Sequence, residues 1–546
     1  MQSFVKIKNP FKPVEERPTP RCVYNWRIYL TAFLSTTSSM LIGYDTGFIG
    51  GMTQNQVFLD KFNIDYEAES GKTIVSNIIS CFHMAAFGGA LFSYPIQFYW
   101  GNCAAMLFAS ASGVIGSAIM LGCINGSLAP LYVGRVISGL CVGAATNVTI
   151  VYLSEVSPAP IRGQIVAIFE VGWRIGDLVG FWINYGVEKG QPAGPDWYVI
   201  PIAVQLIPAG MFFLGSFILK ESPRWLAQHG HYDKALKNLC WLRKLNPGDD
   251  YLDWEFSSMK EGILEQQAEV GTHILDPARK IWNSKKLLKR LMISAWLLVL
   301  PNFMGIQSIN YYSVTLFKQI GFEGDEASMY GTGFLGVMKF GCTAIYIAFI
   351  VDSSGRRPAF LISSFFCAIW FWYIGAYLKV TEDDPSKSGG AAGQMAVGSM
   401  YLWVASFLLA WSGGPFVWAA EVFEQNLRQF TQPINAAMSW IPIFIMAKAT
   451  ASMASTMRYG MFFFFACIDL TAIPFVYFFV PETKGIPLEK IDMLFQDGLS
   501  AWSAHSVTMR RLKEEQEAEK ENNAYGVKDN KDKDKPEVEF VEYVDQ

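Results

Sequence analysis

Long apolar blocks, separated by short polar or charged stretches, run through most of this 546-residue chain. A helix rises about 1.5 Å per residue, so about 20 apolar residues cross the ~30 Å hydrocarbon core of a bilayer. Counted at that length, six blocks precede a charged segment at residues 220–290 and six follow it. We therefore predict an all-α membrane protein with twelve transmembrane helices in two six-helix halves, joined by a central cytosolic helical segment.

The distribution of positive charge predicts how the chain is oriented and divided. Lys and Arg gather before the first span and in the central segment, whereas the loop after the first span carries only Lys61 and Lys72. Positive residues mark the cytosolic side of a membrane protein. We expect both termini in the cytosol and five parts: a cytosolic N-terminal segment (1–26), an N-terminal six-helix half (27–220), a cytosolic helical linker (221–286), a C-terminal six-helix half (287–481) and a cytosolic, largely disordered tail (482–546).

One carboxylate, Asp45, interrupts the first apolar block at residues 28–51. Insertion scales put the cost of an Asp at the centre of a membrane helix at about 2.5 to 3.5 kcal/mol. Such groups usually face a bundle interior, a proton path or a substrate path. We expect a functional role for Asp45, with a structural Asp paired to a neighbour as the alternative.

The two halves of the sequence repeat one another. A Glu precedes an Arg by seven residues after a long apolar block in each half, and two further pairs of residues match at similar offsets. The matched positions are Glu155/Arg162 with Glu421/Arg428 (offset 421 − 155 = 266), Gly101 with Gly355 (355 − 101 = 254) and Glu221 with Glu482 (482 − 221 = 261). Offsets that agree this closely predict a duplicated six-span unit. Two such halves around a midplane site are the architecture of alternating-access carriers.

Six motifs in order resemble the sugar porter branch of the major facilitator superfamily. They are GYDTGFIGG (43–51), GR (134–135), SEVSPAPIRG (154–163), ESPRWL (221–226), DSSGRR (352–357) and PETKG (481–485). Within that branch, three further stretches resemble the fungal quinate permeases, whose relatives include galacturonate and neutral monosaccharide transporters. These stretches are VYNWRIYL (23–30), GFWINYGV (180–187) and VQLIPAG (204–210).

The resemblance implies a proton-coupling pair. Proton-coupled sugar porters carry an Asp in the first span that matches Asp45 and an Arg in the fourth that matches Arg135, and facilitative members tend to lack that Asp. Protonating a carboxylate that faces an Arg in a low-dielectric cleft releases the pair, and deprotonation forms it again. The alternative is a permanently closed structural pair.

The resemblance also implies a cytoplasmic gate made of ion pairs at the inner ends of the spans. Its expected members are Glu155, Arg162, Asp352, Arg356, Arg357, Glu421 and Arg428. The alternative is ordinary positive-inside topology, in which arginines are common at inner helix ends. The first-half loop FYWGNC (98–103) departs from the family pattern Asp, Arg, Gly, Arg, Arg and keeps only Gly101, so this half of the gate has lost its charges.

The fifth span carries Glu170, Arg174 and Asp177 within an arc of about 60° on one helix face. The family has two sugar-binding glutamines at the positions of Glu170 and Asp177. One interpretation is that Arg174 receives a substrate carboxylate, because an Arg fork suits carboxylates, while the acids bind hydroxyls. The other is an internally neutralised cluster that stiffens the helix. Lys339, in the eighth span, is a second candidate for binding a carboxylate.

Matches in later spans complete the substrate site that the resemblance implies. Asn302 matches a family Gln, Gln307 replaces an Asn, Tyr311 is retained, Phe416 takes the position of a Trp, and Trp440 matches an aromatic residue. Core or lipid-facing packing is the alternative for each aromatic side chain.

Two isolated residues bear on these spans. A proline at position 301 is expected to kink the seventh span. His83, alone among small residues in the second span, could relay protons near Asp45. We favour a hydrogen bond between packed helices for His83.

Together these features predict proton-coupled uptake of a monosaccharide-sized polyhydroxylated substrate across the plasma membrane by alternating access, with a sugar acid or quinate-like acid preferred. A neutral hexose or pentose transporter is the first alternative, and a transporter-like nutrient sensor is the second. No nucleophile and base pair, metal cluster or CxxC pair is visible in the sequence, so we expect no enzyme, metal site or cofactor. The expected partners are a small molecule, a proton and the lipid bilayer, with no nucleic acid, and the protein is expected to act as a monomer.

Overall fold

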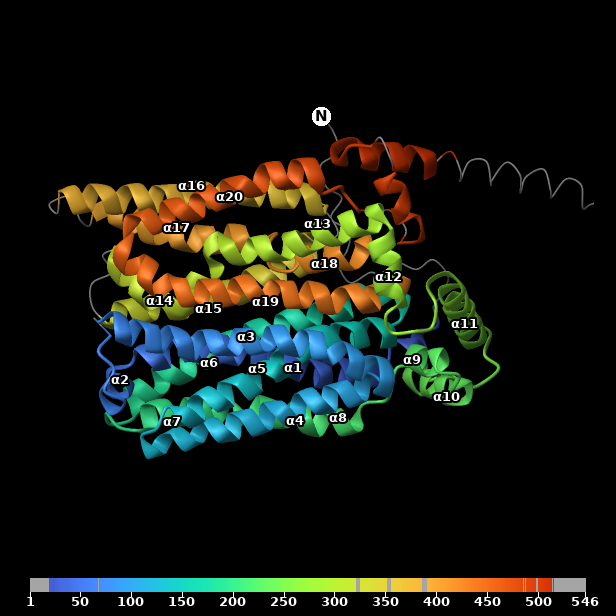
Figure 1. The fold of residues 1–546 in the computed structure, drawn as a ribbon, viewed down its shortest axis with the longest axis horizontal. Coiled ribbons are helices and arrows are strands. Elements are labelled where there is room, and N and C mark those ends of the chain that lie inside the picture. Colours follow the sequence, from blue (N-terminus) through green and yellow to red (C-terminus); the bar gives the residue numbers. More distant parts are fainter. Residues whose placement is uncertain are drawn as a thin grey trace, which may run out of the picture.

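The computed structural model describes residues 19–66, 68–320, 325–350, 355–384, 390–423, 425–484, 486, 488–496, 499–512 and 514. These ranges form helices and connecting turns and contain no β-strand. The long helices run side by side in two halves, with the N-terminal half below the C-terminal half in Figure 1. The expected two-half membrane fold of twelve spans is confirmed.

The N-terminal half contains six spans, the last of which is broken at Gln205. Its helices are α1 (Trp26–Gln54), the short α2 (Gln56–Lys61), α3 (Glu69–Trp100), α4 (Asn102–Met120), α5 (Ala129–Val156), α6 (Arg162–Gly190), α7 (Asp196–Val204) and α8 (Leu206–Ile218).

The C-terminal half repeats this arrangement, with breaks in its first and fourth spans. Its helices are α13 (Lys285–Pro301), α14 (Gln307–Ile320), α15 (Asp325–Ile345), α16 (Arg356–Asp383), α17 (Gly390–Leu408), α18 (Gly414–Val422), α19 (Gln425–Thr456) and α20 (Tyr459–Phe479). A π-helical turn at Asn302–Ile306 joins α13 to α14, where the sequence predicted a kink beside Pro301. Gly305 adopts φ +107° in this turn, a conformation that favours glycine.

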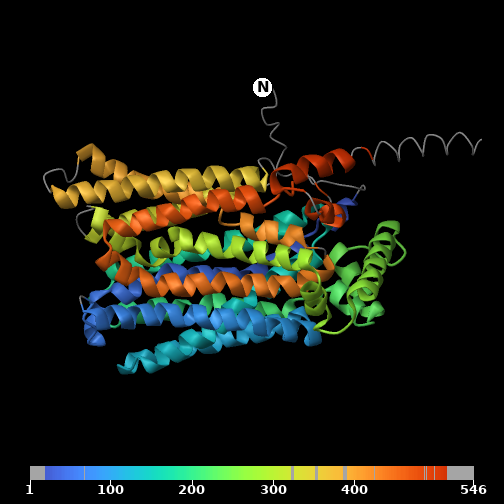
Figure 2. The same cartoon turned by 45° about the horizontal axis from the view of Figure 1, so that its top comes forward.

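The central segment lies beyond one end of the bundle, at the right of Figure 1 and again in the turned view of Figure 2. It consists of α9 (Pro223–Gln228), α10 (Tyr232–Arg243), α11 (Asp250–Val270) and α12 (Asp276–Asn283). The start of α1 is hydrogen-bonded to α10 of the central segment. Asn25 Nδ2 donates to Leu242 O at 2.8 Å, and Arg27 Nη1 donates to Trp241 O at 3.0 Å. A helical stretch at residues 501–512 lies at the same end. The largely disordered tail was expected at residues 482–546, and its described part contains a 3-10 helix at Leu488–Phe495 and this helical stretch. The residues after 514 lie outside the described ranges.

Ten helical segments in the described ranges are long and apolar enough to cross a membrane, and α1 and α6 are not among them. These two helices pack against each other through small residues. A Cβ at Gly43 would overlap the backbone of Trp173, and one at Gly176 would overlap that of Met40. Close small-residue contacts are typical of helices packed in a membrane. The two spans that fall short of this apolar threshold are therefore packed closely against each other, and Gly47 of α1 lies against the backbone of Asp177 on α6.

The repeat extends to the same local contact in both halves. Glu221 accepts hydrogen bonds from the backbone N–H groups of Asn102 and Cys103, both at 3.0 Å, at the start of α4. Glu482 accepts from the backbone N–H groups of Arg356 at 3.1 Å and Arg357 at 2.9 Å, at the start of α16. Carboxylates are stabilised at helix N-termini by the unpaired N–H groups there. Burial raises the pKa of Glu221, and its bonds from the backbone oppose that rise.

Gly101 precedes the first of these contacts at φ +95° and ψ 173°, a region that is essentially restricted to glycine. A Cβ at this position would also overlap the Glu221 carboxylate. We expect Gly101→Ala to lower the free energy of unfolding by about 1 to 3 kcal/mol, measured as a lower melting temperature of the purified protein. Gly163→Ala is the matched control, because nothing lies within 4 Å of its Cβ position. Equal melting temperatures for the two variants would contradict this account.

Candidate functional site

A buried ion pair links α1 to α5 inside the N-terminal half. Arg135 Nη1 donates to Asp45 Oδ1, and both side chains are completely buried. Gln205, at the break between α7 and α8, donates to the same Asp45 oxygen at 3.2 Å. The other carboxylate oxygen, Oδ2, has no hydrogen-bond partner within the described residues. This oxygen is a free acceptor where a proton could bind.

Arg135 keeps other partners that do not depend on Asp45. Its Nε donates to Ile78 O at 3.0 Å and its Nη2 to Ile79 O at 3.3 Å, both on α3. Its guanidinium also lies over the Phe82 ring, 4.3 Å from the centroid. Loss of the Asp45 charge would therefore remove one contact and leave Arg135 held by α3.

The charged face of α6 meets the C-terminal half. Arg174 Nη2 lies 3.7 Å from Glu170 Oε2 and donates to Ser412 Oγ at 2.7 Å, between α17 and α18. Ser412 Oγ in turn donates to Glu170 Oε2 at 3.4 Å. Glu170 and Arg174 thus form a local pair that is joined to the other half by a serine.

Asp177 has a different partner from the one expected on its own helix. Lys339 Nζ, on α15, lies 3.0 Å from Asp177 Oδ2 and donates to Asn310 Oδ1 on α14 at 2.8 Å. Lys339 and Asp177 are both buried. The charged face of α6 therefore takes part in two cation–carboxylate pairs, and the pair of Asp177 with Lys339 spans the two halves.

The break in the seventh span is held by side-chain amides. Asn302 Nδ2 donates to Leu298 O at 2.9 Å and to Ser439 O on α19 at 3.3 Å. Gln307 Nε2 donates to Asn302 Oδ1 at 2.8 Å. The two predicted site residues are thus brought together across the π-helical turn.

Aromatic side chains line the contact between α3 and the C-terminal half. Trp440 is buried, and its Nε1 donates to Thr146 Oγ1 on α5 at 3.4 Å. Tyr311 is also buried, and its backbone carbonyl accepts from Gln54 Nε2 at 2.9 Å. The His83 ring stacks on Trp440 and lies beside Tyr311. Phe416, on α18, is only partly buried.

The hydrogen bond expected for His83 is wrong. Neither ring nitrogen has a hydrogen-bond partner among the described residues, although the side chain is buried. The prediction failed because the neighbours of His83 across the helix contact are aromatic rings.

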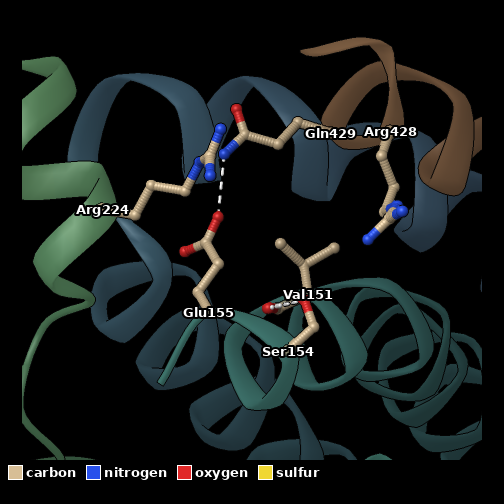
Figure 3. A pocket seen from close by; sticks show the side chains of 6 residues that line it. All are labelled: Val151, Ser154, Glu155, Arg224, Arg428 and Gln429. Carbon is tan, nitrogen blue, oxygen red and sulfur yellow. Dashed lines mark hydrogen bonds between the residues drawn. The ribbon is translucent and has the colours of Figure 1, made fainter. Parts of the chain in front are cut away.

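A contact between the halves lies at the end of the bundle that carries the central segment. Glu155, at the end of α5, accepts from Gln429 Nε2 on α19 at 2.8 Å, as Figure 3 shows, and from Asn102 Nδ2 at 3.0 Å. Arg224 and Arg428 line the same pocket. Asn102 occupies the place that Arg356 has in the other half, so a neutral hydrogen bond replaces the lost charge of the first-half gate.

The other residues that the resemblance placed in a gate form contacts mainly within the second half. Arg356 Nη2 lies 2.7 Å from Glu421 Oε1, Arg357 Nη2 donates to Tyr477 O at 2.9 Å, and Arg428 Nη2 donates to Phe423 O at 3.4 Å. Arg162 lines a neighbouring cavity of about 220 Å³ that also involves the central segment. Asp352 lies outside the described residues.

We expect Gln429→Ala to loosen the contact between the halves at Glu155. Removing a hydrogen bond of this kind costs about 0.5 to 1.5 kcal/mol, so the inner side should open about 2- to 10-fold more often. The measurement is the rate at which an impermeant maleimide labels a Val151→Cys reporter in the pocket of Figure 3. Gln56→Ala, which removes an exposed hydrogen bond to Asp60 near the other end of the bundle, is the control. The same labelling rate in both variants would contradict a role for Gln429 in closure.

Comparison with known proteins identifies the family. Residues 30–495 match the family described as sugar (and other) transporter. The chain belongs to this transporter family. A probable quinate permease of Aspergillus niger is 41% identical over 508 residues, which cover 92% of this chain and 94% of the relative. A quinate permease of Emericella nidulans is 39% identical over 510 residues, which cover 92% and 95%.

Solved structures share the fold of this sugar-family transporter. The proton:xylose symporter XylE bound to 6-bromo-6-deoxy-D-glucose superimposes with a TM-score of 0.70 at 23% identity, covering 86% of this chain and 99% of XylE. An inward open conformation of XylE from E. coli gives a TM-score of 0.66 at 22% identity, with 86% and 100% covered. At this identity the likeness concerns the fold. The family assignment makes the protein a multi-pass membrane transporter of a small molecule and not an enzyme.

Several residues of this transporter's site were not anticipated from the sequence. Gln205, Asn310 and Ser412 each contact a predicted charged residue. Gln205 could have been found from the sequence, because it is a single amide within an apolar block. Asn310 and Ser412 gave none, since their partners lie 29 and 238 residues away in the chain.

Proposed function

We propose that this transporter is a proton symporter that takes up a hydroxylated carboxylic acid of monosaccharide size, similar to quinate, across the plasma membrane. The observation that carries proton coupling is the fully buried pair of Asp45 and Arg135. A proton on Asp45 removes the charge that attracts Arg135, so α1 and α5 can move apart when the proton binds. Charged side chains inside a membrane are energetically costly, and those that occur are usually paired and mark substrate paths or proton relays.

The preference for an acid rests on the cations at the contact between the halves. Arg174 reaches Ser412 of the other half, and Lys339 reaches Asp177. A substrate carboxylate can exchange with Glu170 at the Arg174 fork, because Arg binds carboxylates through paired N–H groups. The relatives named as quinate permeases support an acid of this kind.

The positions of the contacts between the halves support alternating access. Gln54 reaches Tyr311 at one end, Glu155 reaches Gln429 at the other, and the charged pairs lie between them. Opening to either side requires that one set of contacts breaks while the other holds. We propose that one chain carries out this cycle alone, with both termini in the cytosol.

The test is uptake by vesicles that contain the protein, with quinate, D-galacturonate, D-glucose and D-xylose compared with and without an inward proton gradient. We expect concentrative uptake of an acid that stops when a protonophore collapses the gradient. Gradient-driven uptake of a neutral sugar alone would favour the neutral hexose or pentose transporter. The pairing of Arg174 with Glu170 and of Lys339 with Asp177 is compatible with that alternative, because a neutral sugar brings no charge of its own.

Binding without uptake would favour a sensor. The sensor hypothesis rests on the charges missing from the first-half loop and on the charged tail. At that loop Asn102 supplies a neutral hydrogen bond to Glu155.

A further inference from the structure

His83 has an unusual environment for a buried polar side chain. It lies on α3 with 1% of its side chain exposed, and neither Nδ1 nor Nε2 has a hydrogen-bond partner in the described part of the chain. The large majority of buried polar side-chain atoms are hydrogen-bonded, and leaving them unpaired is costly. Two unpaired atoms on one ring therefore point to a partner that binds transiently.

The ring faces the other half of the protein. It stacks on Trp440 of α19 with 5.8 Å between ring centroids and 13° between planes, and its centroid lies 5.4 Å from that of Tyr311 on α14. On its own helix it contacts Phe82 edge to face at 5.4 Å. His83 is therefore the polar member of an aromatic group formed by both halves, at the contact that alternating access must open.

This aromatic group lies near both the Asp45–Arg135 pair and the proposed substrate contacts. Phe82 separates His83 from the Arg135 guanidinium, and Arg135 is held by carbonyls one turn earlier on α3. Trp440 and Tyr311 are proposed substrate contacts on the opposite side. His83 thus lies between the coupling pair and the substrate site.

The chemistry of the ring suits a hydroxyl group. A neutral imidazole offers one N–H donor and one acceptor nitrogen, and a hydroxyl also donates once and accepts. Ligand sites commonly combine aromatic walls with a few polar groups that fix orientation. We propose that His83 hydrogen-bonds a ring hydroxyl of the transported substrate, which passes between it and Trp440 and Tyr311. This rests on the proposed passage of a polyhydroxylated molecule but on neither its charge nor its coupling to protons.

The test compares two variants of His83 with the parent protein in proteoliposomes. His83→Phe keeps a planar ring for stacking and removes both nitrogens, and His83→Gln keeps a donor and an acceptor. With quinate as probe, we expect KM to rise about 10- to 100-fold in His83→Phe and to change less than about threefold in His83→Gln. Quinate analogues that each lack one ring hydroxyl identify the group contacted. For the analogue that lacks the hydroxyl bound by His83, KM should be the same in His83→Phe and in the parent, because neither can form that hydrogen bond.

Two results would overturn the proposal: an unchanged KM for quinate in His83→Phe, or an equal rise for every analogue, which a packing role would produce. If His83→Phe does not fold, the parent and His83→Gln are still compared, and substrate must protect His83 of the parent from diethyl pyrocarbonate, read by mass spectrometry. Absence of protection by any transported substrate would overturn it as well.

If quinate is not transported, the series is repeated with D-xylose or D-glucose and their deoxy analogues. A failed acid preference is thereby separated from a failed role for His83.

Discussion

Asp45→Asn is expected to abolish accumulation of substrate against a gradient while leaving a folded protein that still exchanges substrate across the membrane. The amide keeps the size of the side chain and can still accept a hydrogen bond from Arg135 or Gln205, but it cannot gain or lose a proton. We expect proton-driven accumulation to fall to the level of empty vesicles. Counterflow of labelled against unlabelled substrate measures the exchange that remains.

Asp469→Asn is the matched control for this change. Asp469, on α20, is also a completely buried intramembrane carboxylate, but it accepts from the neutral Trp403 Nε1 at 3.2 Å. We expect accumulation to persist in this variant. Accumulation that survives in Asp45→Asn would show that coupling lies elsewhere, with Glu170 and Asp177 as the next residues to change.

Arg174→Gln is expected to raise KM for quinate about 10- to 100-fold, because a charge-assisted hydrogen bond to a carboxylate contributes about 1.5 to 3 kcal/mol. KM for a neutral sugar, if one is transported, should change much less. The measurement is initial uptake over a range of substrate concentrations at a fixed proton gradient.

The double variant Glu170→Gln/Arg174→Gln separates two effects of Arg174→Gln. One is the loss of the cation, and the other is the buried Glu170 carboxylate that is left without its partner. Removing both partners of a buried pair is often tolerated, whereas removing one is strongly destabilising. We expect the double variant to fold at least as well as Arg174→Gln and to bind quinate equally weakly. Recovery of parental KM in the double variant would mean that Arg174 only neutralises Glu170, as the cluster interpretation holds.

The fold was largely predictable because membrane helices are encoded locally. Apolar blocks of sufficient length gave the spans, and the repeated offsets anticipated the matching contacts of Glu221 and Glu482 at the starts of α4 and α16. The apolar blocks at α1 and α6 were counted among the twelve, although these two helices fall short of the hydropathy that the other spans reach. These two helices bury Ser, Thr and charged residues against each other and the other half, so their composition resembles that of a polar core.

The site was less predictable because its contacts join distant parts of the chain. Periodicity placed Glu170, Arg174 and Asp177 on one face, but the partner of Asp177 is Lys339, 162 residues away. The position of His83 against Trp440 and Tyr311 likewise depends on how the halves pack. Sequence patterns define the faces of helices, and the packing of the two halves decides which faces meet.

Proton movement during quinate uptake tests the central claim most directly. Purified protein is placed in proteoliposomes with a trapped pH indicator, and quinate is added outside with no initial pH gradient. We predict that the interior acidifies as quinate enters, with no acidification in Asp45→Asn and normal acidification in Asp469→Asn. Quinate entry with no change of internal pH in the parent protein would contradict proton symport.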